Sequence, residues 1–282
     1  MLATPHRTTA WADDRAALRA ACDPGVGLCT IVGIEGSFSR RLGAQLAVHP
    51  DGAITGSLAD GCLEKQLASE IAAAPGPVVK RFGAGSELID FRLPCGSGLD
   101  VLIDPQPGRA GCEAAVRRLD AREVAVMRLP CGQLPERRYI PALRLQLFGE
   151  GPELEALVAL AGAAGVEAMA HGKDALSLGR RPAGLSADPW TAVVLLFHDH
   201  EWEQPILEWA LETPAFHIGA QGGFEARRSR IERLAERGVP PEQLARIRSP
   251  IGVIAHSREP GVLALSVLAE IVGEYEALHP HG

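Results

Sequence analysis

Residues 143–164 read LRLQLFGEGPELEALVALAGAA, and the rest of the chain is best understood from this run outward. An apolar strand over 143–148 is followed by a turn with Gly149 and Gly151, and then by an amphipathic helix over 154–164. A strand, a glycine turn and a helix in this order make the first unit of a dinucleotide-binding fold, in which amide groups at the helix start face a phosphate. The run therefore predicts a Rossmann-like parallel sheet in the second half.

The glycine turn departs from the usual dinucleotide fingerprint in two places. Leu154 stands where a third glycine is expected, and the following segment VEAMAHG, residues 166–172, has no Asp or Glu at its end to contact a ribose hydroxyl. Two interpretations are open: a phosphate-binding turn, or a turn that only packs the helix against the sheet. The missing acidic residue makes NAD(P) an unlikely cofactor.

A second apolar strand, 191–197, runs directly into His198, Asp199 and His200. Loops after the carboxyl ends of parallel strands line the ligand crevice, so we expect these side chains at a site. Imidazole and carboxylate groups can ligate a metal or transfer protons, but two histidines separated by one residue on an extended segment point to opposite sides. Further elements expected in this half are a strand at 215–218 and helices at 224–237 and 262–278.

The first half alternates helices and strands without a regular repeat, which is typical of a mixed α+β domain. At its centre is GIEGSFSRRLGAQLAVHPDGAITGSLADGCLE, residues 33–64, where six glycines separate short apolar strands. Glycine loses more backbone entropy on folding than any other residue, so this density indicates a backbone shaped to approach a ligand closely. We expect strands at 28–34, 45–49, 53–57, 78–82, 99–103 and 124–129, and helices at 11–21, 63–73 and 111–119.

Residues 130–143, PCGQLPERRYIPAL, lack clear periodicity and predict a connection between the halves. We therefore expect an α/β protein: an N-terminal mixed α+β domain over 1–130, a linker over 131–142, and a C-terminal Rossmann-like, doubly wound parallel sheet over 143–282.

Composition limits the function classes. The chain has 282 residues, 46% of them hydrophobic, which is enough for about two domains with real cores. A formal charge of -7 argues against a general nucleic-acid binder. Six cysteines without paired zinc spacing are expected as reduced thiols, and the absence of a signal segment or a long apolar run predicts a cytoplasmic protein without a membrane partner. Three arginine pairs are solvated faces or anion contacts: Arg40-Arg41, Arg137-Arg138 and Arg227-Arg228.

The run over 36–64 resembles the N-terminal signature of the xanthine dehydrogenase accessory protein family (XdhC/CoxI). That signature has a Gly-Ser, an arginine, a Gly-Ala, an apolar strand, an Asp-Gly, a Gly-Ser and a closing Gly-Cys-x-Glu. The chain meets it at Gly36-Ser37, Arg40, Gly43-Ala44, Asp51-Gly52, Gly56-Ser57 and Gly61-Cys62-Leu63-Glu64. The segment LPCGSGLDVLIDP, residues 93–105, is similar to the family's second cysteine motif; Cys95-Gly96 keeps its start, and Ser97 replaces its second glycine.

The resemblance extends over nearly the whole chain. TAVVLLFHDHEWEQPIL, HIGAQGGFEARRSRIERL and ARIRSPIGV are similar to segments of the family's second half. Where the family has a glycine-serine-arginine loop this chain has Gly222-Gly223-Phe224, and Val253-Ile254 replaces the family's Leu-Asp. These departures identify a divergent member and count further against a nicotinamide role.

What the resemblance implies is a cytoplasmic molybdenum cofactor chaperone rather than an enzyme. Such a protein binds and protects the cofactor (molybdopterin), supports its sulfuration and inserts it into a xanthine dehydrogenase-type molybdenum hydroxylase. The implied partners are this client enzyme and a cysteine desulfurase, with a homodimer as an option. The residues expected to bind the cofactor are Gly36, Ser37, Arg40, Gly56, Ser57, Gly61, Cys62, Glu64, Cys95, Gly149, Gly151, His198, Asp199 and His200.

Within that set Cys62 and Cys95 are the thiols expected nearest the molybdenum, although each is open to the alternative of a small buried residue at a turn. Two other functions are open. An NAD(P)-linked oxidoreductase would use Gly149, Gly151 and the residues after the 191–197 strand. A scaffold would dock the client enzyme and the desulfurase without binding the cofactor.

Overall fold

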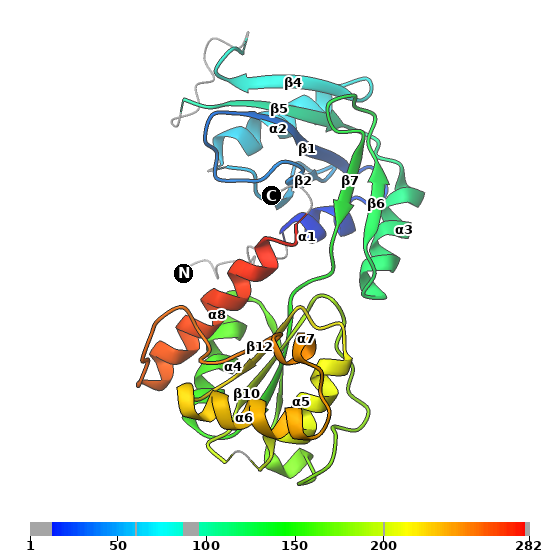
Figure 1. The fold of residues 1–282 in the computed structure, drawn as a ribbon. Helices are drawn as coiled ribbons and strands as arrows, with labels where there is room; N and C mark the ends of the chain where they lie inside the picture. Colours follow the sequence, from blue (N-terminus) through cyan, green and yellow to red (C-terminus); the bar gives the residue numbers. More distant parts are fainter. Residues whose placement is uncertain (1–12, 60, 87–95, 200, 280–282) are drawn as a thin grey trace, which may run out of the picture. The chain divides into compact units, whose positions relative to one another are not determined.

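The computed structural model describes residues 13–59, 61–86, 96–199 and 201–279. The chain divides into two compact units, residues 1–141 with 279–282 and residues 142–278 (Figure 1). The first holds an antiparallel sheet with helices, and the second holds a parallel sheet of the Rossmann-like kind, so the predicted α/β class is confirmed.

The N-terminal unit is built on a five-stranded sheet in the order β3-β2-β1-β5-β4, with every neighbouring pair antiparallel. A register shift between Ile31 and Gly33 marks a bulge in the central strand, where Gly33 lies against Asp100. The strands are β1 (Gly27–Glu35), β2 (Gln45–Val48), β3 (Ile54–Gly56), β4 (Val78–Gly83) and β5 (Gly98–Asp104).

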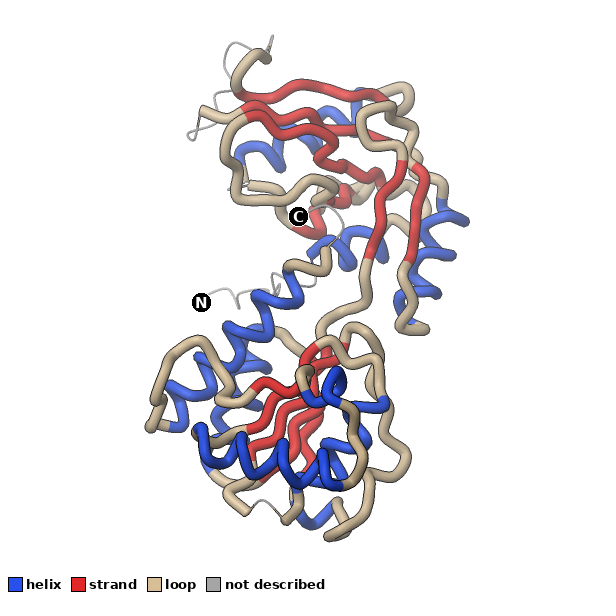
Figure 2. Tube along the Cα trace, viewed as in Figure 1, coloured by secondary structure: helices blue, strands red, loops and turns tan. Residues whose placement is uncertain are grey.

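Both faces of this sheet are covered. The helix α2 (Cys62–Ala73) buries Leu63 and Leu67 against the face that carries Cys29 and Ile31. Leu28, on the other face, packs with α1 (Asp13–Ala20), α3 (Arg109–Asp120) and a hairpin of β6 (Ala125–Arg128) and β7 (Glu136–Tyr139). Figure 2 shows the two hairpin strands beside α3. The central strand thus separates two cores.

Strand β7 lies inside the segment 131–142 that the sequence predicts as a linker. Its residues alternate between exposed and buried, and the buried ones are Arg137 and Tyr139. Arg137 Nε donates to the carbonyl of Gly43 at 2.7 Å, and its guanidinium lies 4.7 Å from the centre of the Tyr139 ring. Because Arg137 is buried, its interpretation as a solvated or anion-binding residue is wrong. A charged residue at an inward position also breaks the alternation of apolar and polar residues by which a strand is predicted.

The C-terminal unit contains a five-stranded sheet in the order β12-β11-β10-β8-β9, parallel throughout. Numbered from the first strand of the unit this order is 2-1-3-4-5, so the connections change direction between β8 and β10, where doubly wound sheets bind ligands. The strands are β8 (Arg144–Gly149), β9 (Glu167–His171), β10 (Thr191–Leu196), β11 (His217–Ala220) and β12 (Ile247–Arg248).

Helices lie on both faces of this sheet, as a doubly wound fold requires (Figure 1). The helices α4 (Pro152–Ala164) and α8 (Pro260–Glu276) contact each other, as do α5 (Glu203–Glu212) and α6 (Phe224–Glu236). The sequence did not predict α5, the strand β12, the 3₁₀ turn η1 (Lys173–Ala175) or α7 (Pro241–Leu244). Throughout the described residues, no helix has the length and apolar character that crossing a membrane requires.

Candidate functional site

Loops from three parts of the N-terminal sequence are joined near the carboxyl end of β1. Arg40 Nε donates to the carbonyl of Ser57 at 3.1 Å, and Arg40 Nη2 donates to the Ser57 hydroxyl at 3.3 Å. The Ser97 hydroxyl donates to the carbonyl of Ser37. We call residues 36–40, 56–59, 61–64 and 96–97 the glycine-loop cluster. The structure therefore links both glycine motifs to Ser97 of the second cysteine motif.

All four glycines of the cluster, at positions 36, 56, 61 and 96, adopt positive φ angles that side chains disfavour. Gly61 precedes α2 with a φ of 103°, and no atom lies within 4 Å of the position that its Cβ would take. Glycine is therefore needed at position 61 for its backbone angle, not to avoid a steric clash. Gly36 has a φ of 82° and lies against Ser97. The departure of Ser97 from the family's glycine thus supplies a hydroxyl that closes the first loop, a contact that the sequence did not reveal.

Glu64 holds the turn before α2 in place. Its Oε1 accepts from the amides of Leu58 at 3.0 Å and Ala59 at 2.6 Å, and its Oε2 accepts from the amide of Gly61 at 2.7 Å. Burial raises the pKa of Glu64, but the hydrogen bonds from these amides and its own amide outweigh burial and lower the pKa below its ordinary value. The carboxylate is thus committed to the chain's own backbone.

Cys62 is the first residue of α2 and an exposed free thiol. Cys29 and Cys112 are buried, and burial raises the pKa of both thiols, that of Cys112 to about 11. Of the cysteines that the structure describes, only Cys62 is exposed, so the alternative of a buried residue at a turn does not apply to it. Cys95 lies outside the described residues.

In the C-terminal unit, Gly149 ends β8 at the point where the strand connections change direction. A Cβ there would lie 2.7 Å from the carbonyl oxygen of Leu196 on β10, so close strand packing requires this glycine. Gly151 precedes α4 with a φ of 82° and has open space at its Cβ position apart from Glu153 at 3.8 Å. Packing against the neighbouring strand accounts for Gly149 without a phosphate.

An ion-pair network links the loops that follow β8, β9 and β10. Lys173 Nζ lies 2.7 Å from Glu150 Oε1 and 3.8 Å from Asp199 Oδ2, and 5.5 Å from the centre of the Trp202 ring. The hydrogen bond to Glu150 raises the pKa of Lys173. The sequence analysis missed Lys173, for which the available signal was its position just beyond the end of a parallel strand.

The start of α4 carries carboxylates where a dinucleotide fold holds its pyrophosphate. Glu153 and Glu155 occupy the first turn, and Glu153 Oε2 lies 3.5 Å from His198 Nε2. Negative side chains already satisfy the positive end of a helix and repel a phosphate there. The nearby His198 is exposed, and His200 lies outside the described residues.

At the end of β9, where a nucleotide-binding fold has its acidic residue, the chain has His171. Its Nε2 lies 2.6 Å from Gln146 Oε1, and its ring stacks on Phe148 with the centres 4.9 Å apart. Burial lowers the pKa of His171, which favours the neutral ring at neutral pH. In the part of the chain that the structure describes, no three His, Cys, Asp or Glu residues form a group that could hold a metal ion.

Comparisons with known proteins bear on both units. A family model described as "XdhC and CoxI family" matches residues 22–83, and one described as "XdhC Rossmann domain" matches residues 145–271. A protein of Escherichia coli (strain K12) named molybdenum cofactor insertion chaperone PaoD is 34% identical over 286 aligned positions, covering 92% of this chain and 88% of that protein. The chain belongs to the XdhC and CoxI family. The resemblance that the glycine and cysteine motifs indicated is thereby confirmed.

A solved structure supports the same fold. A crystal structure described as a xanthine dehydrogenase from Bacillus halodurans aligns with a TM-score of 0.71 and 21% sequence identity, over 95% of this chain and 97% of that one. The likeness shows that the chain shares its fold with another protein. The first family match contains two of the three loops of the glycine-loop cluster.

Proposed function

We propose that this chain is a molybdenum cofactor insertion chaperone and that its glycine-loop cluster contacts the cofactor. The observation that carries the proposal is the exposed thiol of Cys62 at the start of α2, beside a turn that Glu64 holds rigid. The identity of 34% with a protein named for this role, over most of both chains, supports it.

The chemistry of the cluster suits such a cargo. The cofactor combines a molybdenum-bound dithiolene with an anionic phosphate, so a carrier needs soft ligands near the metal and amide or cationic donors near the phosphate. Cys62 offers a thiol, the glycine turns leave backbone groups accessible, and Arg40 adds a positive charge. We propose Cys62 and Cys95 as the thiols nearest the metal, and Glu64 as a positioning residue.

The finer steps are also proposals. The chain would support sulfuration with a cysteine desulfurase as the sulfur donor, and would deliver the cofactor to a xanthine dehydrogenase-type molybdenum hydroxylase. A cytoplasmic location and a homodimer belong to the same proposal. We do not assign a nicotinamide nucleotide to Gly149, Gly151, His198 or Asp199, because Glu150 and Glu153 add negative charge where its phosphates would lie.

The test is anaerobic purification from cells that make the cofactor, followed by molybdenum analysis and by fluorescence of the oxidised pterin. Cys62→Ser is compared with Cys131→Ser, a half-buried free cysteine in the same unit. We expect the wild-type chain and Cys131→Ser to retain molybdenum and pterin, and Cys62→Ser to lose most of both with its circular dichroism unchanged. If neither component associates even after cofactor is supplied, the carrier role fails.

A client-activation assay separates the carrier from a scaffold. A scaffold that only docks the client and the desulfurase predicts full client activity with Cys62→Ser, whereas a carrier predicts a loss of activity that parallels the loss of molybdenum. Retention and client activity that both match the wild-type chain would remove Cys62 from the proposed site.

A further inference from the structure

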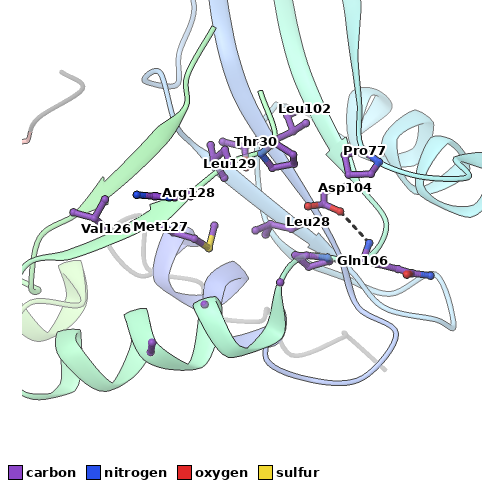
Figure 3. A pocket seen from close by; sticks show the side chains of 15 residues that line it. Leu28, Thr30, Pro77, Leu102, Asp104, Gln106, Val126, Met127, Arg128 and Leu129 are labelled. Carbon is purple, nitrogen blue, oxygen red and sulfur yellow. Dashed lines mark hydrogen bonds between the residues drawn. The ribbon is translucent and has the colours of Figure 1, made fainter. Parts of the chain in front are cut away.

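A separate pocket of about 530 Å³ lies on the face of the N-terminal sheet that α3 and the β6–β7 hairpin cover (Figure 3). We call it the Asp104 pocket. Its walls come from β1, β5, the start of α3 and β6. Its volume is in the range of small-molecule sites. Its lining combines apolar side chains, namely Leu28, Leu102, Met127 and Leu129, with a few polar groups.

Asp104 is the acidic residue among those that line this pocket, and 8% of its surface is exposed. Its Oδ1 accepts from the amide of Gln106 at 3.1 Å, the dashed line in Figure 3. Within the described ranges, the structure shows no hydrogen bond to Oδ2. Burial raises the pKa of Asp104. Among the described residues Oδ2 has no donor and yet is not fully buried, so it is an accessible acceptor to which a ligand in the pocket can donate.

Thr30 adds a second polar group from the middle of β1, and 1% of its surface is exposed. Its Oγ1 accepts from Gln45 Nε2 at 3.0 Å, and no acceptor for its hydroxyl proton is found among the residues the structure describes. The hydroxyl can therefore donate toward the pocket. Asp104 and Thr30 together offer an acceptor and a donor from neighbouring strands.

The start of α3 forms another part of the lining. Gly108 precedes the helix and Gly111 lies in its first turn, and no atom is within 4 Å of the Cβ position of either. Glycine destabilises a helix relative to alanine, and packing does not require it here. Both glycines keep the pocket side of the helix start open. Pro105 and Pro107 stiffen the connection from Asp104.

We propose that the Asp104 pocket binds a flat heteroaromatic ring that carries an amino group beside a ring nitrogen. This unit is shared by cytosine, guanine, adenine and pterins. The amino group donates to Asp104, the Thr30 hydroxyl donates to a ring nitrogen or carbonyl oxygen, and the apolar side chains pack against the ring faces. An anionic substituent on the ring would meet the start of α3 and the side chain of Arg128 at the rim.

Other ligand classes fit the lining less well. A free anion would be repelled by Asp104, and an apolar ligand would bury the carboxyl without a donor. A metal ion would find a single carboxylate, since the described residues contain no group of three metal-binding side chains. An aminated ring satisfies the acceptor, the donor and the apolar walls together.

This pocket is distinct from the glycine-loop cluster. Asp104 pairs with Leu28 near the first residue of β1, whereas Gly98, beside Ser97 of the cluster, pairs with Glu35 at its last. Seven residues of strand separate the two positions, or about 23 Å. The inference therefore does not depend on the proposed cofactor role.

Equilibrium dialysis of the full chain against labelled cytidine, CMP, guanosine, GMP and 6-hydroxymethylpterin tests the inference. Asp104→Asn replaces one carboxylate oxygen with an NH₂ group, which cannot accept a hydrogen bond from the amino group of the ligand. This variant should weaken binding on the order of tenfold or more. Gly111→Leu adds a side chain into the pocket and should abolish binding. Ala110→Leu is the matched control, because Ala110 is exposed next to Gly111 and does not line the pocket; it should bind as the wild-type chain does.

The probes also distinguish the source of the ring. Binding of one or more of them that Gly111→Leu abolishes and Ala110→Leu preserves supports the inference, and their ranking separates a nucleobase from a pterin. Tighter binding of CMP than of cytidine would support the anion contact at α3. No binding of any probe at millimolar concentration, or binding that Gly111→Leu leaves unchanged, overturns the inference. Since these probes contain no molybdenum, the result is separate from cofactor retention at Cys62.

Discussion

Replacing Glu64 with glutamine should loosen the turn that presents Cys62. The carboxylate accepts hydrogen bonds from three backbone amides. In Glu64→Gln the side-chain NH₂ group replaces one accepting oxygen and would face a backbone N–H, so that hydrogen bond is lost. Loss of one charge-assisted hydrogen bond costs about 2 kcal/mol, which corresponds to roughly 30-fold faster local opening. Hydrogen–deuterium exchange of a peptide spanning residues 54–66 measures this opening at pH 7. Glu113→Gln is the control, because Glu113 makes partly exposed ion pairs on α3.

The same variant makes a prediction about pH. The folded-state pKa of Glu64 is lowered, so its stabilisation is fully present above the unfolded pKa of about 4.3 and is lost as the pH falls through the folded value. The difference between wild type and Glu64→Gln should therefore shrink at acidic pH. Exchange in this peptide that stays within about threefold of wild type at pH 7 would refute the assigned role, given the expected 30-fold change.

Three further predictions concern the C-terminal unit. Gly149→Ala should destabilise it by about 1–3 kcal/mol in urea unfolding, because its Cβ would meet a backbone carbonyl, whereas Gly162→Ala at an open position in the last turn of α4 should be neutral or stabilising; equal effects would contradict the packing explanation. Arg230→Met should cost about 3–5 kcal/mol by the same assay, because it removes the two hydrogen bonds that Arg230 donates to the buried Glu203, and a loss below about 1 kcal/mol would contradict this. Titration with NADH should give no change in nicotinamide fluorescence, because Glu153 lies at the start of α4; saturable binding would contradict this.

The elements with strong local signals were predictable from the sequence. The strand, glycine turn and helix around Gly149 appear within about two residues of expectation, because hydrophobic period and glycine position specify them locally. Strand β7 was missed because its inward positions hold Arg137 and Tyr139, and a buried charge reads as a surface residue when its partner lies far away in the sequence.

The candidate site was predictable as a set of motifs but not as a geometry. Spacing indicated that Cys62 follows a tight turn, and the structure adds that Glu64 is committed to backbone amides. The hydrogen bond from Ser97 to the loop at Ser37 joins residues 60 positions apart. The Asp104 pocket combines strands, a hairpin and a helix start that no local pattern relates, so it could be found only in three dimensions.

The contact between Arg137 and Gly43 sets a lower limit on any fragment of this protein that can be studied alone. A Cβ at Gly43 would lie 2.7 Å from Arg137 Cδ, and the arginine's Nε holds the carbonyl of the same residue. A fragment that stops after the 22–83 family match, or at residue 130, would therefore lack the side chain that braces the glycine-rich segment. Expression boundaries belong after Tyr139, and Gly43 and Arg137 are expected to change together among relatives.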